Sequence, residues 1–320
     1  MGTAIAKIIG DNGHTVKIWN YEGNQAPLEE INNIHENKQY LSGIKLSPKV
    51  VAEKDLETAV RGAEVVFFVV PSGAMESVIK RVAGFLPCGI VCVDASKGID
   101  EKDLGLIPNL IAAYLPTCLH GSVASISGPA VAGDMARGGF TAMNVASRDT
   151  KSIKVVKAVM ENNHLRLIKT RDLVCVEVAG SFKNVYAIAM GLCDGLKMAM
   201  NTKSALLVLA LKEIGKLVKK MGGKSETVYD LAGLGDLIGT GLCAESRNRR
   251  FGEYLAQGHE KDEAIKMVGQ VVEGVNASKV LKELGEKYKL KMPFAEMVYG
   301  VVWNGVDPLQ ALTKFLRSIK

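Results

Sequence analysis

Four short apolar runs alternate with helical segments in the first half of the chain, and this alternation constrains the fold most. The runs are rich in β-branched residues and lack strict apolar–polar alternation, as expected of strands buried on both faces. They are TVKIW (15–19), EVVFFVV (64–70), GIVCVDAS (89–96) and SVASISG (122–128). We therefore predict an α/β fold with a doubly wound, mostly parallel sheet through about residue 148, completed by a helix from 151 and the run HLRLIKT.

From about residue 172 the pattern becomes almost entirely helical. A chain of 320 residues exceeds the size at which single hydrophobic cores usually stop growing, roughly 250 to 300 residues. We therefore predict two domains, one built on the sheet over residues 1–171 and an all-helical one over residues 172–320.

The composition is that of a soluble protein with a large core, at 48% hydrophobic and 23% charged residues. The net charge of +6 is mildly basic, and the densest basic cluster is SRNRR at 246–250. This cluster has no interleaved aromatic residues and no accompanying nucleic-acid motif. An anionic small molecule is therefore the better partner, and we expect no nucleic acid.

The cysteines and histidines predict no metal site. No CxxC, HExxH or other Cys/His ligand pattern occurs. Most cysteines lie among apolar residues, where a free thiol behaves as a small buried hydrophobe. We expect all six to be reduced, namely residues 88, 92, 118, 175, 193 and 243.

No targeting segment is visible, so the cytoplasm is the expected location. One stretch, residues 174–192, approaches the length of a membrane span. It contains Glu177 and Lys183, and two charges at bilayer depth are costly. A buried helix in a globular core is the better interpretation, and we expect no membrane insertion.

The chain opens with a pattern typical of the second half of a dinucleotide-binding unit. Gly2 precedes an amphipathic helical segment and a strand, as does the last glycine of a GxGxxG fingerprint, where the pyrophosphate sits on the helix N-terminus. Glu22 lies twenty residues beyond Gly2, where an acid would bind the ribose hydroxyls. The window NYEGNQA holds no Arg or Lys for a 2′-phosphate, which favours NAD over NADP.

Two further turns follow buried strands, and ligands bind at the carboxyl ends of strands in open α/β sheets. These turns are Pro71-Ser72-Gly73 and Gly128-Pro129. The sequence therefore predicts a Rossmann-type domain with its ligand at this edge.

Lys183-Asn184 is the most unusual pair, because it lies inside the apolar segment VEVAGSFKNVYAIAMGL. Burial lowers the pKa of a lysine and makes the neutral amine accessible near pH 7. A lysine whose stem is buried and whose ammonium reaches solvent is the alternative.

Three other segments carry charged residues suited to catalysis or anion binding. Lys97 follows a strand in DASKGID, Asp236 lies between glycines in LAGLGDLIGTG, and SRNRRFG packs three arginines into four residues. Each has a plain structural alternative: a surface lysine, a glycine-rich link and a solvated charge run.

Together, the order and the amino-acid sequences of these segments resemble those of the NAD-dependent glycerol-3-phosphate dehydrogenase family. The resemblance covers nearly the whole chain through FFVVPS, ASKGI, ISGPAVA, GSFKNVYAIAMGLCDGL, NTKSAL, LAGLGDL, SRNRRFG, QVVEG and MPFAEMVYG. SRNRRFG after AGLGDL is the most specific part.

The resemblance implies reversible hydride transfer between dihydroxyacetone phosphate and sn-glycerol 3-phosphate with NAD(H), linking glycolysis to glycerolipid precursors, and a homodimer. It implies three catalytic residues: Lys183 as the general acid/base, Lys97 as an orienting group near the nicotinamide, and Asp236 as their counter-charge. Burial and the second ammonium would both push the pKa of Lys183 toward neutrality.

The same resemblance implies the remaining site residues. The substrate set is Lys97, Gly128, Ala130, Lys183, Asp236, Ser246, Arg247 and Asn248. The cofactor set is Met1, Gly2, Tyr21, Glu22, Pro71, Lys97, Ala132, Arg247, Val271 and Glu273.

In this family the first strand ends in GxGxxG, so the first strand and two glycines are expected before Met1. That strand would lie between those at 15–19 and 64–70, and without it we expect an unpaired apolar gap. Truncation, an internal methionine taken as the start and real loss all fit the sequence.

Two alternatives stay open. A β-hydroxyacid dehydrogenase would carry an asparagine four residues after its lysine, where this chain has Ala187. A non-catalytic remnant would have lost cofactor binding with its first strand, although the intact Lys97, Lys183, Asp236 and Arg247 set argues against long-standing loss.

Overall fold

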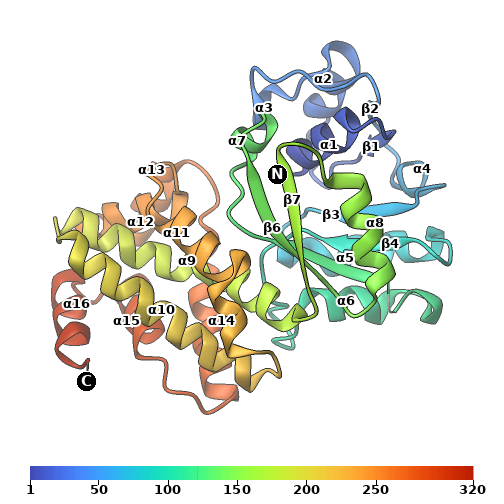
Figure 1. The fold of residues 1–320 in the computed structure, drawn as a ribbon. Coiled ribbons are helices and arrows are strands. Elements are labelled where there is room, and N and C mark those ends of the chain that lie inside the picture. The colour runs from blue at the N-terminus through green and yellow to red at the C-terminus, as the bar shows by residue number, and fades with distance from the viewer. Residues whose placement is uncertain (121, 320) are drawn as a thin grey trace. The chain divides into compact units, whose positions relative to one another are not determined.

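The computed structural model describes residues 1–120 and 122–319, and its fold is drawn in Figure 1. The chain divides into two compact units. The N-terminal unit is Met1–Asp100 with Gly105–Leu173, and the C-terminal unit is Val174–Lys320 with the short segment Glu101–Leu104.

A five-stranded sheet with the order β3-β4-β5-β6-β7 forms the centre of the N-terminal unit. Neighbouring strands are parallel except for β5 and β6, which are antiparallel. The strands are β3 (Val65–Phe68), β4 (Val91–Asp94), β5 (Val123–Ser127), β6 (Thr141–Ser147) and β7 (Leu165–Thr170). The predicted α/β fold with a mostly parallel sheet is confirmed.

Helices cover both faces of this sheet, and each face has its own apolar core. On one face, Ile5 and Ile9 of α1 (Gly2–Asp11) and Val156 of α8 (Thr150–Met160) pack against the strands. On the other face, the packing side chains come from α4 (Leu56–Val60), α5 (Ser72–Val82) and α6 (Ile107–Tyr114). Strands buried on both faces explain the continuous apolar runs in the sequence.

The first two strands form a separate parallel pair, β1 (Val16–Ile18) and β2 (Val50–Ala52). No ladder joins β1 to β3, yet Val16 and Val65 pack against one core and Trp19 and Val66 against the other. β4 and β5 are fully buried, whereas three of the four residues of β3 are only half-buried. The sheet is thus interrupted between residues 15–19 and 64–70, where the sequence led us to expect a gap.

The remaining elements of this unit are short: α2 (Ala26–Ile34), α3 (Lys38–Leu41), η1 (Ala83–Phe85), η2 (Thr117–Leu119) and α7 (Ala132–Ala136). The turn after η1 and the one at η2 are joined by a disulfide between Cys88 and Cys118, whose Cα atoms are 5.8 Å apart. The expectation that all six cysteines are reduced was therefore wrong. These two cysteines lie at exposed turns before β4 and β5. They are therefore outside the apolar surroundings that indicate a free, buried thiol.

All the regular elements of the C-terminal unit, among its described residues, are helices. Its elements are α9 (Leu173–Gly195), α10 (Met200–Lys220), η3 (Ser225–Tyr229), η4 (Leu231–Gly235), α11 (Asp236–Gly241), α12 (Arg247–Ala256), α13 (Lys261–Val268), α14 (Glu273–Lys287), α15 (Pro293–Asn304) and α16 (Pro308–Arg317). α9 is long and apolar enough to cross a membrane, but 94% of its most apolar window is buried inside the protein. It is the central helix of this unit, and a helix that is apolar all round belongs in a core.

Two glycines let α12 pack directly on the backbone of α9. A Cβ at Gly191 would lie 1.8 Å from the carbonyl oxygen of Arg249, and one at Gly252 would lie 2.0 Å from that of Ile188. Real Cβ atoms do not approach so closely, so any side chain here would push the helices apart. This contact fixes the start of α12 relative to the middle of α9.

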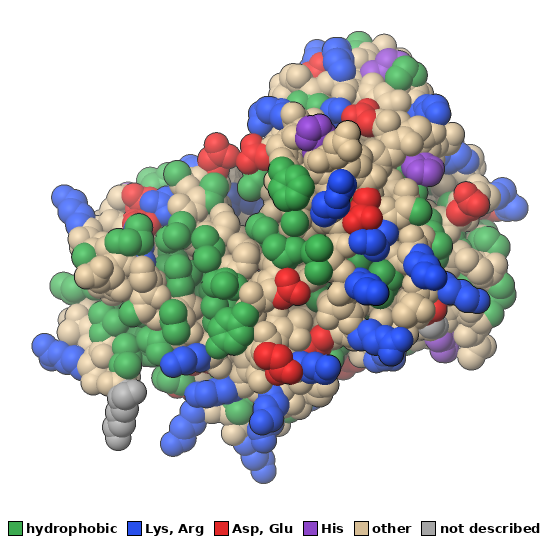
Figure 2. Space-filling view, viewed as in Figure 1, with side chains coloured by type: hydrophobic (Ala, Val, Ile, Leu, Met, Phe, Trp, Pro, Cys, Tyr) green, Lys and Arg blue, Asp and Glu red, His purple; other side chains and the backbone are tan. Residues whose placement is uncertain are grey.

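The surface of this unit is partly apolar. Figure 2 shows apolar side chains gathered over its helices on the face in view. Exposed apolar side chains of the unit include Met200 at 56%, Val208 at 50% and Tyr229 at 57% of their full exposure.

Candidate active site

Lys183 lies in the middle of α9 and is only 5% exposed, beside Asn184 at 3% exposed. Its neighbours along the helix, Phe182 and Val185, are buried as well. A buried ammonium needs a partner of opposite charge, because removing a charge from water is costly. The position of this partner therefore defines the site.

The partner is Asp236, which forms an ion pair with the Nζ atom of Lys183 and is 2% exposed. The π-helical turn η4 leads directly into α11, so Asp236 begins α11, where a carboxylate is favoured by the helix dipole. Gly233 permits this geometry, since a Cβ there would lie 2.0 Å from the carbonyl oxygen of Val228. Gly233 of LAGLGDL thus serves close packing, and this packing brings Asp236 to Lys183.

Thr240 completes this pair from one turn further along α11. Its hydroxyl donates a hydrogen bond of 3.3 Å to Oδ1 of Asp236. Thr240 was not identified from the sequence. The i, i+4 spacing of Asp and Thr in GDLIGTG could have indicated that the two side chains lie together on one helix face.

Asn184, next to the lysine, belongs to a chain of hydrogen bonds that joins three helices. Its Nδ2 donates to Oε2 of Glu273 at 3.0 Å, and its Oδ1 accepts from Nδ2 of Asn248 at 2.9 Å. Oδ1 of Asn248 in turn accepts from the backbone N–H of Gly274 at 2.8 Å. A Cβ at Gly274 would lie 2.6 Å from the carbonyl oxygen of Asn184, so α14 begins in contact with α9.

Arg247 lies beside this chain, with a guanidinium nitrogen 3.6 Å from Oε1 of Glu273. Its side chain keeps 38% of its exposure, whereas Asn248 is 5% exposed. Arg247 therefore retains donors that can reach a solvent-borne anion, and a planar guanidinium suits phosphate. The Asn248 side chain is buried and already bonded through both of its polar atoms, which makes it a group that holds the site in position.

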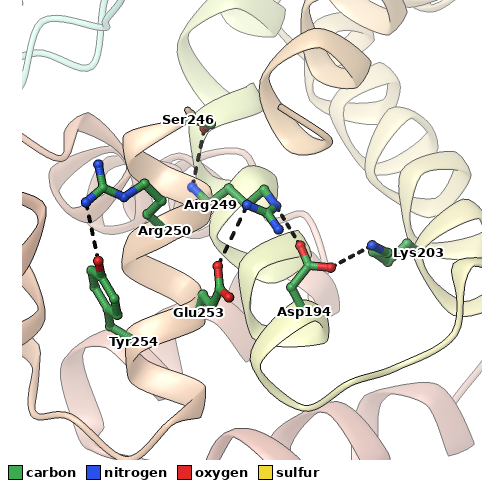
Figure 3. Close-up of polar contacts among 7 residues, drawn as sticks. All are labelled: Asp194, Lys203, Ser246, Arg249, Arg250, Glu253 and Tyr254. Carbon is green, nitrogen blue, oxygen red and sulfur yellow. Dashed lines mark hydrogen bonds and ion pairs between the residues drawn. The ribbon is translucent and has the colours of Figure 1, made fainter. Parts of the chain in front are cut away.

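A second polar cluster, drawn in Figure 3, anchors the helix that carries Arg247. Nε of Arg249 and Nζ of Lys203 each lie 2.6 Å from a different oxygen of Asp194, at the end of α9. Ser246 caps α12, its hydroxyl accepting from the N–H of Arg249 at 3.4 Å. Arg249 thus ties α12 to α9, and Ser246 is occupied as a helix cap.

The predicted cofactor and substrate residues of the N-terminal unit gather at one edge of its sheet. Pro71 follows β3, Lys97 follows β4 and Gly128 follows β5, and these strands are adjacent and parallel. A Cβ at Gly2 would lie 3.7 Å from Val69, so α1 begins beside the end of β3. These residues therefore lie at the carboxyl ends of the strands, which is the edge where the sequence predicts the ligand.

Local contacts suit this edge to a close-fitting ligand. A Cβ at Gly98 would lie 2.5 Å from the side chain of Ser72, and one at Gly128 would lie 2.8 Å from Cα of Met143. Met1 is the N-cap of α1 and makes no side-chain cap hydrogen bond, and the first turn of this helix begins beside the end of β3. These features fit a dinucleotide, whose pyrophosphate binds at such a helix N-terminus. Ala130 and Ala132 border the same edge, before and at the start of α7.

Glu22, predicted to bind ribose, is half-exposed and accepts a 2.6 Å hydrogen bond from the Tyr40 hydroxyl. The bond to this carboxylate raises the pKa of Tyr40 to about 12. Tyr21 beside it is 40% exposed. Tyr40 was not identified from the sequence, and nothing in the pattern around it signalled its role.

The structure thus brings together the predicted residues of the C-terminal unit, Lys183 with Asp236 and Arg247 with Glu273. Val271, also predicted for the cofactor, is 72% exposed in the link before α14. Met1 is the N-cap of α1, and Lys97 lies in the other unit. Among the described residues, no group of three or more His, Cys, Asp or Glu side chains could hold a metal ion.

Comparison with known proteins assigns both units. The N-terminal model of the NAD-dependent glycerol-3-phosphate dehydrogenases matches residues 1–153, and the C-terminal model matches residues 172–313. The chain belongs to this family. The resemblance seen in the sequence is confirmed, as is the Rossmann-type fold with a helical second half.

Curated relatives agree over the whole chain. A glycerol-3-phosphate dehydrogenase [NAD(P)+] of Bacillus velezensis is 35% identical over 320 residues, which are 100% of this chain and 92% of that protein. The enzyme of the same name from Bacillus thuringiensis is 36% identical and is covered to 93%.

Solved structures of this dehydrogenase family are also similar. Glycerol-3-phosphate dehydrogenase from Coxiella burnetii has a TM-score of 0.92 at 34% identity, covering 98% of this chain and 95% of that one. The enzyme from Saccharomyces cerevisiae has a TM-score of 0.86 at 26% identity, covering 99% and 96%. A D-mandelate dehydrogenase shares only the fold, with a TM-score of 0.58 at 12% identity.

Proposed function

We propose that this glycerol-3-phosphate dehydrogenase interconverts dihydroxyacetone phosphate and sn-glycerol 3-phosphate with NAD(H). The observation that carries this proposal is the buried ion pair of Lys183 and Asp236 in the same helical unit as the half-exposed Arg247. The ion pair can donate and accept a proton, and Arg247 can bind a phosphate. A phosphorylated hydroxyketone needs both.

A nicotinamide cofactor held at the sheet edge would supply the hydride for reduction at the substrate C2 and would accept it in the oxidation. The reduction also consumes one proton, which must reach the C2 oxygen. The ammonium of Lys183 donates that proton, leaving a neutral amine, and the same amine accepts it in the oxidation. Asp236 stabilises the ammonium form, and the hydrogen bond from Thr240 orients the carboxylate.

Arg247 holds the substrate phosphate through its planar guanidinium. Asn248 and Ser246 are bonded within the protein and position the start of α12, and each has a further donor hydrogen with which it binds the phosphate beside Arg247. Lys97 orients the substrate, together with Gly128 and Ala130. The cofactor is held at the sheet edge by Gly2, Pro71 and Ala132, while Tyr21 and Glu22 contact the adenosine part.

NAD is the preferred nucleotide, because the segment after β1 carries no Arg or Lys to pair with a 2′-phosphate. The cytoplasm is the proposed location, and a homodimer is the proposed assembly. The exposed apolar side chains of Met200 and Val208, in the first half of α10, offer a surface for a second copy.

The test is an NADH oxidation assay followed by absorbance. We expect oxidation with dihydroxyacetone phosphate and much less with dihydroxyacetone, which lacks the phosphate. A preference for a short β-oxo acid, the oxidised form of a β-hydroxyacid, would favour the alternative dehydrogenase. If the chain still shows no turnover after a β-strand ending in GxG has been added before Met1, a non-catalytic remnant is favoured.

A further inference from the structure

A cavity of about 520 Å³ opens in the C-terminal unit, on elements that the catalytic pair does not use. It lies among α10, η3, the start of α15 and the end of α16, and we call it the α10 cavity. Small-molecule sites in proteins typically measure about 300 to 1,000 Å³. The α10 cavity therefore has room for a compact organic ligand.

The walls of the α10 cavity are mainly apolar and aromatic. Phe294 and Phe315 line it, and their rings stack with centroids 4.8 Å apart. Leu209 and Val228 also line it, as does Tyr229, which is 57% exposed. A flat apolar body can pack against such rings, because offset aromatic contacts add to simple burial.

One carboxylate, Glu213, lies at the floor, and its hydrogen bonds are already satisfied. Its Oε1 accepts from the N–H of Ala295 at 2.8 Å and from the Tyr186 hydroxyl at 3.0 Å, and its Oε2 accepts from the N–H of Phe294 at 3.1 Å. Burial raises the pKa of Glu213, which favours its neutral form. This group therefore caps α15 and leaves the rim to set the charge of the cavity.

The rim is cationic. Lys212, Lys216 and Lys219 are exposed and line the cavity from one face of α10, since residues three and four apart are neighbours on a helix. Glu226 is the only other acidic residue of the described lining. Apolar walls below a row of ammonium groups match a ligand with an apolar body and an anionic head.

We propose that the α10 cavity binds an aromatic anion, a carboxylate or sulfonate on a flat apolar body, with its ring against Phe294 and Phe315 and its charge among the rim lysines. A second copy of this chain fits the same place less well. Two-fold symmetry would set one lysine row facing its counterpart, and like charges repel.

The experiment uses 8-anilinonaphthalene-1-sulfonate as the anionic probe and N-phenyl-1-naphthylamine as its uncharged counterpart. Fluorescence titration of the 320-residue chain measures both dissociation constants. The double variant Lys212→Gln/Lys216→Gln removes two rim charges. Lys282→Gln is the matched control, because Lys282 lies 4.6 Å over the ring of Tyr299 but outside the cavity.

We expect the double variant to raise the dissociation constant of the sulfonate by roughly 2- to 30-fold, since two exposed ion pairs are lost. The constant for the uncharged probe should change less than about twofold by the same reasoning, because no ion pair is involved. The control should bind both probes as the parent does. In the chain extended before Met1 by a β-strand that ends in GxG, saturating NAD⁺ should not displace the sulfonate, which separates this site from the cofactor site.

Three results would overturn the proposal: equal weakening of both probes, unchanged binding in the double variant, or displacement by NAD⁺. Sedimentation gives a fourth. If Tyr229→Glu converts a dimer to a monomer and sulfonate binding appears only then, a second copy covers the cavity. A thermal midpoint for each variant keeps loss of fold apart from loss of binding.

Discussion

Lys183 of α9 and Asp236 of α11 form an ion pair in which the side chains keep only 6% and 2% of their exposure. They are 53 residues apart in the sequence and meet because η4 packs through Gly233. Removing one member of a buried pair leaves an uncompensated charge. This relationship therefore has consequences for both catalysis and stability.

Replacing Lys183 by alanine should slow the chemical step by roughly 10²- to 10⁴-fold, the usual contribution of a positioned proton donor. The dissociation constant for NADH should stay nearly unchanged, because Lys183 is assigned to the substrate. Both are measured on the chain extended before Met1 as described below, by single-turnover absorbance and fluorescence titration. Lys220→Ala, on the exposed end of α10, is the control. Comparable turnover in the Lys183 variant would remove the assignment.

Asp236→Ala should destabilise the protein by about 3 to 5 kcal/mol, because it strands a buried ammonium. The double variant Lys183→Met/Asp236→Leu should recover most of this loss, since apolar groups of similar size often replace a buried pair at little cost. Urea unfolding of the parent, of Asp236→Ala, of the single variants Lys183→Met and Asp236→Leu, and of the double variant gives the free energies. Additive losses in the double variant would show that the two charges do not depend on each other.

Arg247→Lys should raise KM for dihydroxyacetone phosphate more than it raises Kd for NADH. The positive charge stays, but the planar fork that fits a phosphate is lost. The measurement compares both constants in parent and variant. Arg250→Lys is a matched control on the same helix, because its guanidinium contacts Tyr254. An equal loss of cofactor affinity would assign Arg247 to the nucleotide as well.

Adding a β-strand that ends in GxG before Met1 should tighten NADH binding and raise the thermal midpoint. The unpaired edges of β1 and β3 would gain ladder partners, at roughly 1 to 3 kcal/mol for each buried group now left unbonded. The added glycines would present N–H groups to the pyrophosphate ahead of α1.

The 320-residue chain should correspondingly bind NADH poorly. The comparison uses fluorescence titration and thermal melts of both forms, with a polar, Gly/Ser-rich extension of equal length as the control. Tight binding and an unchanged midpoint in the short form would show that Gly2 is not the last glycine of a phosphate-binding loop.

Reduction of the Cys88–Cys118 disulfide should destabilise the protein by about 3 to 4 kcal/mol, the loop-closure value for a separation of 30 residues. Urea unfolding with and without dithiothreitol measures this. Cys88→Ser/Cys118→Ser should no longer respond to the reductant, whereas Cys243→Ser, at a free cysteine, should respond as the parent does. Six titratable thiols in the unreduced, denatured parent would contradict the pairing.

The layers of the fold, the residues at the sheet edge and a buried lysine in the helical half could all be predicted from sequence patterns. Apolar runs buried on both faces give a mostly parallel sheet whatever the details of packing, and turns after such strands place Pro71, Lys97 and Gly128 at one edge. Lys183 could be identified because it lies in an apolar helical segment. Burying a charge is costly unless an opposite charge compensates it.

Which of these groups compensate each other became visible only in the folded chain. The pairing of Lys183 with Asp236, the bonding of Asn184 to Asn248 and the disulfide of Cys88 with Cys118 join residues far apart along the chain. Local patterns report burial and helix or strand period, and they carry no information about which distant backbone approaches. That approach depends on contacts such as Gly252 on Ile188, where the absence of a Cβ sets the distance between two helices.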